Sequence, residues 1–204
     1  RQGMTLSEVT TRLLRGLDVQ SWLLPVTDDP LATMVETVEY GVLGFQEYFV
    51  RHRWQPTVRR LWFEGAEQAR LSDAVRDALG TADVIVMCPS NPVLSIAPLL
   101  AVPGMRETLA ARRGKCVAVS PFIGGKAVKG PAEKIMREMG LEISPRGLAG
   151  YYAGLLDGLV IDEADRDQPS ADGVPVLVTN TLMQSSEEKV RLAGEILSWV
   201  GSGT

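Results

Sequence analysis

The stretch ADVIVMCPSNP, residues 82–92, joins an apolar run to a turn that contains two prolines, a serine and an asparagine. An apolar run without polar alternation predicts a central parallel strand that is buried on both faces. CVAVS, residues 116–120, shows the same pattern and leads into a loop rich in glycine and lysine. We therefore predict neighbouring parallel strands, each with a polar loop at its carboxyl end.

Helices and strands alternate around these two runs. Ser72 and Gly80 are residue types that begin and end a helix, here over about 72–79. Ser185 and Glu188 have the spacing of a capping box before the last helix. Two more strands are predicted in LLDGLVIDEAD, residues 155–165, and VPVLVTN, residues 174–180. The alternation indicates an α/β fold, with a Rossmann-like and mostly parallel sheet flanked by helices.

The first third of the chain has a different pattern. A helix over about 5–17 is followed by SWLLPV, which predicts a strand over 21–26. MVETVEY and FQEYFVRHRW are rich in β-branched or aromatic residues and flank GVLG, so they predict an antiparallel hairpin. VRRLWFEG, residues 58–65, predicts one more strand. We expect this hairpin insertion, about 33–63, within a single α/β domain that covers residues 1–204.

The chain has 204 residues, 45% of them apolar, and a formal net charge of −4. This length and composition suit one domain with a substantial core. The negative charge argues against a general nucleic-acid binder, and no apolar run reaches the length of a membrane span. His52 is the only histidine, which argues against a His/Cys metal site and against a histidine-based triad. Cys88 and Cys116 lie in apolar runs, so we expect buried free thiols and a cytoplasmic protein.

The loop SPFIGGKAVKGPAEK, residues 120–134, has the residue types of an anion site. Gly124 and Gly125 let backbone N–H groups turn inward, and the helix that follows offers its N-terminal end to negative charge. Lys126 and Lys129 can neutralise phosphate oxygens. A solvated loop with surface lysines explains the same residues equally well. The loop matches neither the Walker A pattern nor the dinucleotide-binding GxGxxG pattern.

Two further loops follow predicted strands. In PSNP, two prolines stiffen a turn that presents Ser90 and Asn91, which can bond a nucleotide base, ribose or phosphate. In TDDP, Asp28 and Asp29 can bind Mg²⁺, accept a proton or fix a ligand hydroxyl. Both loops are also ordinary turn sequences, and that alternative stays open.

Several segments together resemble one protein family. PSNPVLSIAPLLAVPGMRETL, SPFIGGKAVKGPAEKIMREMGLE and YYAGLLDGLVIDEAD are similar to segments of the 2-phospho-L-lactate transferases, the CofD-like family of coenzyme F-420 biosynthesis. LLPVTDDPLATMVET and FQEYFVRHR match the same pattern in the same order, so the resemblance covers nearly the whole chain. The combination of SNP with GGKAxKGPA at this spacing is quite specific.

The resemblance implies a transferase reaction. A phospholactyl or phosphoenolpyruvyl group, carried as a guanosine diphosphate ester, would move to the terminal ribityl hydroxyl of the deazaflavin Fo. GMP would leave, and Mg²⁺ would assist. The implied partners are therefore a guanosine-linked donor and the Fo acceptor, with no nucleic acid and no membrane. Apolar helix faces also suggest a homodimer.

The resemblance also implies roles for particular residues. It places Ser90, Asn91 and Pro92 at the guanosine-phosphate site. It places phosphate against four residues of the next loop, Gly124, Gly125, Lys126 and Lys129. It turns Thr27, Asp28 and Asp29 toward the reacting centre or the acceptor, and our hypothesis is that one of these aspartates is the catalytic base.

Two features depart from the family pattern. Relatives open with a strand and a GGxGG loop, and this chain has no such segment. We therefore expect it to be the carboxyl-terminal portion of a longer transferase, with little or no activity alone. TNTLM, residues 179–183, stands where TDTLM is expected, so Asn180 keeps its hydrogen bonding but lacks the charge. That change argues against a role for this side chain in binding a metal or another cation.

Other functions remain open from the sequence. The same scaffold could serve a non-catalytic regulatory protein that binds a nucleotide or a sugar nucleotide. The loops could also be plain turns in an α/β domain without a phosphate ligand. Within the transferase hypothesis, the sequence does not distinguish a lactyl from an enolpyruvyl donor.

Overall fold

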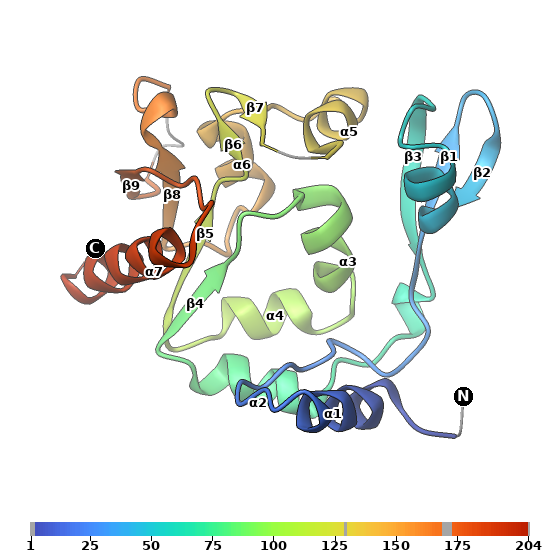
Figure 1. Ribbon diagram of the computed structural model, residues 1–204, viewed down its shortest axis with the longest axis horizontal. Helices are drawn as coiled ribbons and strands as arrows, with labels where there is room; N and C mark the ends of the chain where they lie inside the picture. The colour runs from blue at the N-terminus through green and yellow to red at the C-terminus, as the bar shows by residue number, and fades with distance from the viewer. Residues whose placement is uncertain (1–2, 129, 169–172, 204) are drawn as a thin grey trace.

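A parallel sheet forms one side of the molecule in a computed structural model that describes residues 3–128, 130–168 and 173–203 (Figure 1). Its four strands lie in the order β4-β5-β8-β9, and each neighbouring pair is parallel. The strands are β4 (Val84–Met87), β5 (Lys115–Val119), β8 (Gly158–Asp162) and β9 (Val176–Thr179). The parallel order confirms the predicted fold class, and it brings the loops after all four strands to the same edge of the sheet.

Helices cover both faces of this sheet. On one face, Val117, Val119 and Val160 pack against the apolar side of α7 (Ser186–Gly201). On the other face, Ala118 and Leu159 join a larger core that includes residues of four helices. These helices are α2 (Asp73–Thr81), α3 (Ala97–Leu100), α4 (Met105–Ala110) and α6 (Pro145–Tyr151). Alternate residues of each central strand thus pack into cores on opposite faces of the sheet, as expected for a strand with two buried faces.

An antiparallel sheet forms the other side of the molecule (Figure 1). Its strands are β1 (Ala32–Thr37), β2 (Gly41–Gly44) and β3 (Val58–Glu64), with β1 in the centre. Val35 and Tyr48 from this side share a core with Ile135 and Met136 of α5 (Ala132–Glu138). A continuous core therefore joins the hairpin region to the loops of the parallel sheet.

Short elements complete the chain. Those before the parallel sheet are α1 (Leu6–Gly16), the π-helix η1 (Glu47–Arg51) and the 3₁₀ helix η2 (Ala66–Gln68). Those between and after its strands are the π-helix η3 (Pro92–Ile96), α3 (Ala97–Leu100), β6 (Phe122–Ile123), β7 (Lys126–Ala127) and the 3₁₀ helix η4 (Glu163–Asp165). Among the described residues, no helix combines the length and the apolar character that crossing a bilayer requires.

Two predicted strands in the first third of the chain are wrong. Residues 21–26, all of which the structure describes, form no strand. They pack Leu24 and Val26 against the core, while Trp22 is 87% exposed. The predicted second arm of the hairpin, residues 45–54, is mostly helical, and GVLG itself is β2 rather than the turn. Aromatic residues are common in strands, but here Tyr48 is buried from within a helical turn.

The first apolar run also differs from its prediction. Within the part of the chain that the structure describes, β4 lies at an edge of the sheet and not in its centre. Val86 is accordingly 39% exposed. Cys88 is exposed, whereas Cys116 is buried as predicted, and burial raises the pKa of the Cys116 thiol to about 11.

The capping box of α7 is confirmed and can be tested. The Ser185 hydroxyl accepts the Glu188 N–H at 3.3 Å, and the Glu188 carboxylate accepts the Ser185 N–H at 2.8 Å. Ser185→Ala is expected to lower the free energy of unfolding by about 1 kcal/mol because one N–H of the first turn loses its acceptor. Urea unfolding measures this change, and Ser198→Ala, at an exposed position inside the same helix, serves as the control with no expected loss. Equal stabilities of the two variants would contradict the capping role.

Candidate functional site

A hollow of about 1010 Å³ opens at the carboxyl edge of the parallel sheet. Loops after β4, β5 and β9 form one side of it, and the region around η1 forms the other. It is lined by Phe45, Phe49, Trp54, Pro89, Ser90, Asn91, Leu94, Ser95, Ser120, Pro121, Ile123, Ala127, Val128, Gly130, Pro131, Ala132, Thr181, Leu182, Met183 and Gln184. Its position agrees with the rule that open α/β sheets bind ligands beyond the carboxyl ends of their strands.

The PSNP loop supplies a polar wall of this hollow. The Asn91 Oδ1 accepts the N–H groups of Val93 and Leu94, at 3.0 and 3.1 Å, and so caps the start of η3. Its Nδ2 is buried and has no partner among the described residues. Pro92 begins η3 and is itself buried, so it supports the wall without lining it. The structure thus brings two predicted residues, Ser90 and Asn91, to the hollow.

Three aromatic side chains form the facing wall. The ring centroids of Phe45 and Phe49 lie 5.3 Å apart, and those of Phe49 and Trp54 lie 5.2 Å apart. Trp54 has a φ of 48°, a left-handed conformation that costs a bulky residue energy. The Tyr48 hydroxyl donates to the Trp54 carbonyl at 3.3 Å and helps to hold it. This wall offers flat apolar surface to a planar ligand.

The glycine loop is the turn of the β6–β7 hairpin, whose two short strands pair antiparallel. Gly124 and Gly125 have φ values of 59° and 71°, as a two-residue hairpin turn requires. Their N–H groups point inward, but the acceptor is the buried carboxylate of Asp165, at 3.0 and 2.9 Å. These donors are therefore occupied within the chain, contrary to the predicted phosphate cradle.

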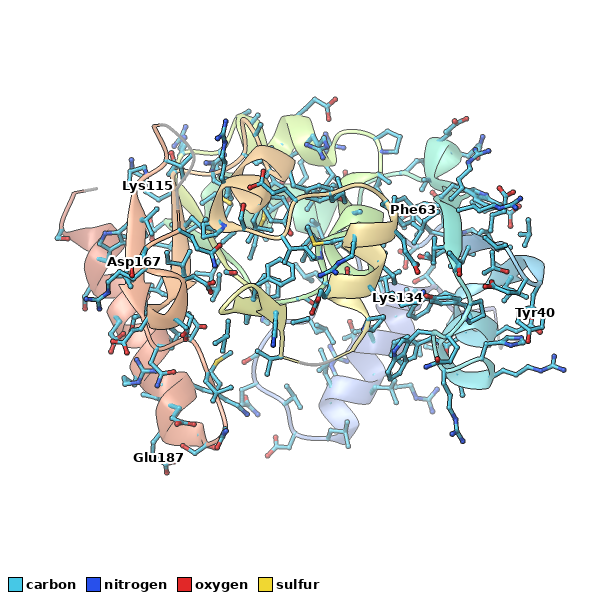
Figure 2. The ribbon with its side chains drawn as sticks, turned by 90° about the horizontal axis from the view of Figure 1, so that it is seen from above. Tyr40, Phe63, Lys115, Lys134, Asp167 and Glu187 are labelled. Atoms are coloured by element: carbon cyan, nitrogen blue, oxygen red, sulfur yellow. The ribbon has the colours of Figure 1, made fainter. Side chains whose placement is uncertain are left out.

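The lysines of the loop have separate positions. Lys126 is exposed on β7 and is not among the described residues that line the hollow. Lys129, the second predicted phosphate ligand, lies outside the described residues. Lys134 is a residue of α5 whose side chain points toward the antiparallel sheet (Figure 2), and its Nζ donates to the Pro56 carbonyl at 2.7 Å and pairs with Glu138 at 2.8 Å. Lys134 therefore connects two parts of the fold.

The structure places the TDDP loop in a different hollow. Asp28 and Asp29 lie beside Arg70, Arg76 and Pro103 there, and neither is among the described residues that line the first hollow. The Asp28 Oδ1 accepts the N–H of Ser7 at 2.7 Å. Asp29 accepts the backbone and side-chain N–H groups of Arg70, which lower the pKa of this carboxyl and make it a weaker base. Thr27 is buried, and its hydroxyl accepts the Asp29 N–H at 3.1 Å, as in an ordinary turn.

A segment after β9 forms a further wall, which sequence analysis did not assign to the site. Thr181 to Gln184 line the hollow. The Asp162 carboxylate accepts the N–H and the hydroxyl of Thr181, at 2.9 and 3.1 Å. Asn180 is exposed, and its Oδ1 accepts the Leu182 N–H at 2.9 Å. An aspartate could make the same turn, so the missing charge at this position leaves the local structure intact.

The described residues do not fit a Mg²⁺ ion held by the protein. No aspartate, glutamate or histidine is among the described residues that line the hollow. Nor does that part of the chain contain three or more acidic, histidine or cysteine side chains grouped to hold a metal. Mg²⁺ commonly binds through one or two carboxylates together with substrate phosphates. The Mg²⁺ implied by the resemblance stays a prediction, one that the described lining of this hollow does not support.

The aromatic wall and the Asp162 and Asp165 carboxylates were not predicted from the sequence. Phe45 and Phe49 are four residues apart, which is the spacing of one helix face, and this signal could have identified the helical turn. Asp165 lies 41 and 40 residues from the glycines that it contacts. No local pattern could have connected these residues.

Comparisons with known proteins find similar sequences and a similar fold. A family model described as 2-phospho-L-lactate transferase CofD matches residues 1–190. The chain is 41% identical over 201 residues to a 2-phospho-L-lactate transferase of Methanococcoides burtonii, covering 97% of this chain and 65% of that protein. It is 43% identical over 199 residues to one of Methanopyrus kandleri, covering 96% and 63%. It is 34% identical over 212 residues to a phosphoenolpyruvate transferase of a Mycobacterium species, covering 97% and 64%.

The chain spans about 62–65% of the length of the curated relatives that it matches. Among solved structures, a member of the UPF0052 family from Bacillus halodurans superposes with a TM-score of 0.59 at 15% identity. That superposition covers 93% of this chain and 66% of the other. Likeness at this level of identity concerns the fold alone.

Proposed function

Because the chain belongs to the family of the 2-phospho-L-lactate transferase CofD, we propose that it forms part of a transferase in coenzyme F-420 biosynthesis. The enzyme moves a phospholactyl or phosphoenolpyruvyl group from a guanosine diphosphate ester to the deazaflavin Fo. The hollow at the carboxyl edge of the parallel sheet is where this chain contributes to binding.

The observation that supports the proposal is the contrast between two facing walls. Ser90, Asn91 and Ser95 offer hydroxyl and amide groups of the kind that bond a ribose, a base or a phosphate. Phe45 and Phe49 offer flat apolar rings on the other side. A donor with a polar nucleotide and an acceptor with a planar tricycle need this combination.

The reaction is a displacement at phosphorus. The acceptor hydroxyl forms a new O–P bond, the bond between that phosphorus and GMP breaks, and the hydroxyl proton passes to a base or to water. Holding the two substrates in line provides much of the rate of such a transfer. In our proposal, the polar wall orients the guanosine phosphate and the aromatic wall orients the acceptor.

The assignment of Asp28 or Asp29 as the base finds no support in the geometry. Both side chains belong to a separate hollow, and the pKa of Asp29 is lowered by its hydrogen bonds from Arg70. Among the described residues that line the first hollow, the remaining polar groups are neutral. We propose that these residues position substrates and do not themselves take the proton.

The alternative, a non-catalytic protein that binds a sugar nucleotide, makes a different prediction about ligand choice. Isothermal titration calorimetry of the purified chain with GDP and with UDP-N-acetylglucosamine separates the two functions. GDP is expected to bind at least about tenfold more tightly, which corresponds to about 1.4 kcal/mol of selectivity. Preference for the UDP sugar would favour the regulatory function, and no heat with either compound would contradict both.

A further inference from the structure

We propose that Asp162 and Asp165 are positioning residues that hold two walls of the hollow in place. Asp162 is the last residue of β8, and Asp165 ends the short helix η4 that follows this strand. The carboxyl end of β8 contributes no residue to the described lining of the hollow. Their side chains are buried, with exposed fractions of 7% for Asp162 and 1% for Asp165. Each carboxylate bonds backbone N–H groups of a different wall. This inference rests on the proposed function where it concerns the ligand.

Asp165 fixes the wall made by the β6–β7 hairpin. One carboxylate oxygen accepts the Gly124 N–H, and the other accepts the Gly125 N–H and the Gln168 side-chain amide. A hairpin with strands of two residues has too few ladder bonds to keep its own place. Two charge-assisted bonds at its turn compensate for this weakness, since a carboxylate with N–H donors makes the stronger kind of hydrogen bond.

Asp162 fixes the wall after β9 in a similar way. Its Oδ2 accepts both donors of Thr181, and its Oδ1 accepts the Ala164 N–H at 3.0 Å. The same carboxylate therefore starts η4, which carries Asp165. The two walls are thus tied to one short turn, and the separation between them depends on both aspartates.

The carboxylate oxygens are occupied as acceptors, which explains why these aspartates act as positioning residues and not as ligands. Each carboxylate oxygen already accepts at least one N–H from the chain, and neither residue is among the described lining of the hollow. A preformed pocket does not have to order flexible segments when it binds its ligand, so less of the binding free energy is lost to ordering. Loss of a buried carboxylate should therefore weaken ligand binding through the wall that it holds.

The test uses Asp165→Asn. This change replaces one carboxylate oxygen with an NH₂ group, which cannot accept a hydrogen bond, so at least one of the two glycine N–H groups loses its acceptor. Exchange of the Gly124 and Gly125 amide protons, followed by NMR, is expected to accelerate by about tenfold or more, the size that loss of a charge-assisted bond predicts. The dissociation constant for GDP, measured by calorimetry, is expected to rise by a similar factor of about ten.

Two matched variants accompany this test. Glu163→Gln removes a charge from the same turn at an exposed position, and it should change neither the exchange rates nor the affinity. Asp165→Glu keeps a carboxylate that can reach the glycines. It should therefore restore part of the slow amide exchange and part of the GDP affinity. Asp162→Asn tests the other wall through the Thr181 amide proton if the Asp165→Asn chain does not fold.

The outcomes separate this inference from the proposed function. If the wild type binds GDP and Asp165→Asn binds equally well, the positioning role is overturned and the proposed function stands, even if the glycine amides exchange faster. If the wild type does not bind GDP, the proposed function falls, and the exchange rates alone decide whether the aspartates hold the walls. Unchanged exchange at Gly124, Gly125 and Thr181 overturns the inference in every case.

Discussion

Ser95→Trp is expected to abolish GDP binding, with a loss of at least about a hundredfold in affinity, or about 2.7 kcal/mol. Ser95 lies on η3 with its side chain exposed and lining the hollow. An indole at this position would occupy the space between the polar and aromatic walls, where it excludes the ligand sterically. Because the side chain points away from the core, the thermal midpoint should change little.

Ser95→Ala is the matched control, since it removes the hydroxyl without filling the space. It is expected to reduce affinity by no more than about tenfold, the size of one lost neutral hydrogen bond. Calorimetry with GDP measures both variants, and circular dichroism confirms that they are folded. Wild-type affinity in Ser95→Trp would show that the nucleotide binds elsewhere.

Asp157→Ala is expected to lower the free energy of unfolding by about 3 kcal/mol or more, because it leaves a buried guanidinium without its charge partner. Arg112 pairs with Asp157, and its side chain is only 8% exposed. The same carboxylate accepts the Cys116 N–H at 2.8 Å, at the start of β5. Urea unfolding measures the loss.

The exposed pair of Glu47 and Arg51 provides a control for this variant. Their side chains are 41% and 75% exposed, and Glu47→Ala should cost less than about 1 kcal/mol. The double variant Arg112→Met with Asp157→Leu should recover much of the loss, because no unpaired charge remains. A loss with Asp157→Ala as small as that with Glu47→Ala would contradict the importance of the buried pair.

Acidification gives a second measure of the same pair. Burial acts to raise the pKa of Asp157, but the bonds from Cys116 and Arg112 outweigh it and hold the pKa below the ordinary value of 3.8. A folded-state pKa below the unfolded one means that the contribution is complete above the unfolded value and is lost as the pH falls through the folded value. Asp157→Ala should therefore have a flatter dependence of stability on pH below about 4.

Local signals in the sequence were sufficient for the order of the parallel strands' loops and for two helix starts, whereas the Ser72 side chain makes no capping bond at the start of α2. Thr5 and Ser185 each cap a helix with a glutamate three residues on, and both capping boxes are present in the structure. The run CVAVS is buried on both faces, as its lack of polar alternation predicts. These features depend on neighbours in sequence, which is why a single sequence predicts them well.

Features that depend on distant contacts could not be predicted in this way. The burial of β4 depends on which strand lies beside it, and an apolar run does not reveal its neighbours. The glycine pair correctly predicts a turn with inward N–H groups, but it does not identify the acceptor. An internal carboxylate and a ligand phosphate would each accept hydrogen bonds from the same glycine N–H groups. Only the position of Asp165 shows which of the two is the acceptor here.

Two π-helices, η1 and η3, lie on opposite sides of the hollow. A π-turn carries one residue more than the α-turn that it replaces, and it thereby rotates the side chains that follow by about 100°. A single deletion at either position is therefore expected to present different side chains to the hollow. Because Tyr48 and Val93 of these turns are also buried in the core, the same deletion would have to be accommodated by repacking around them.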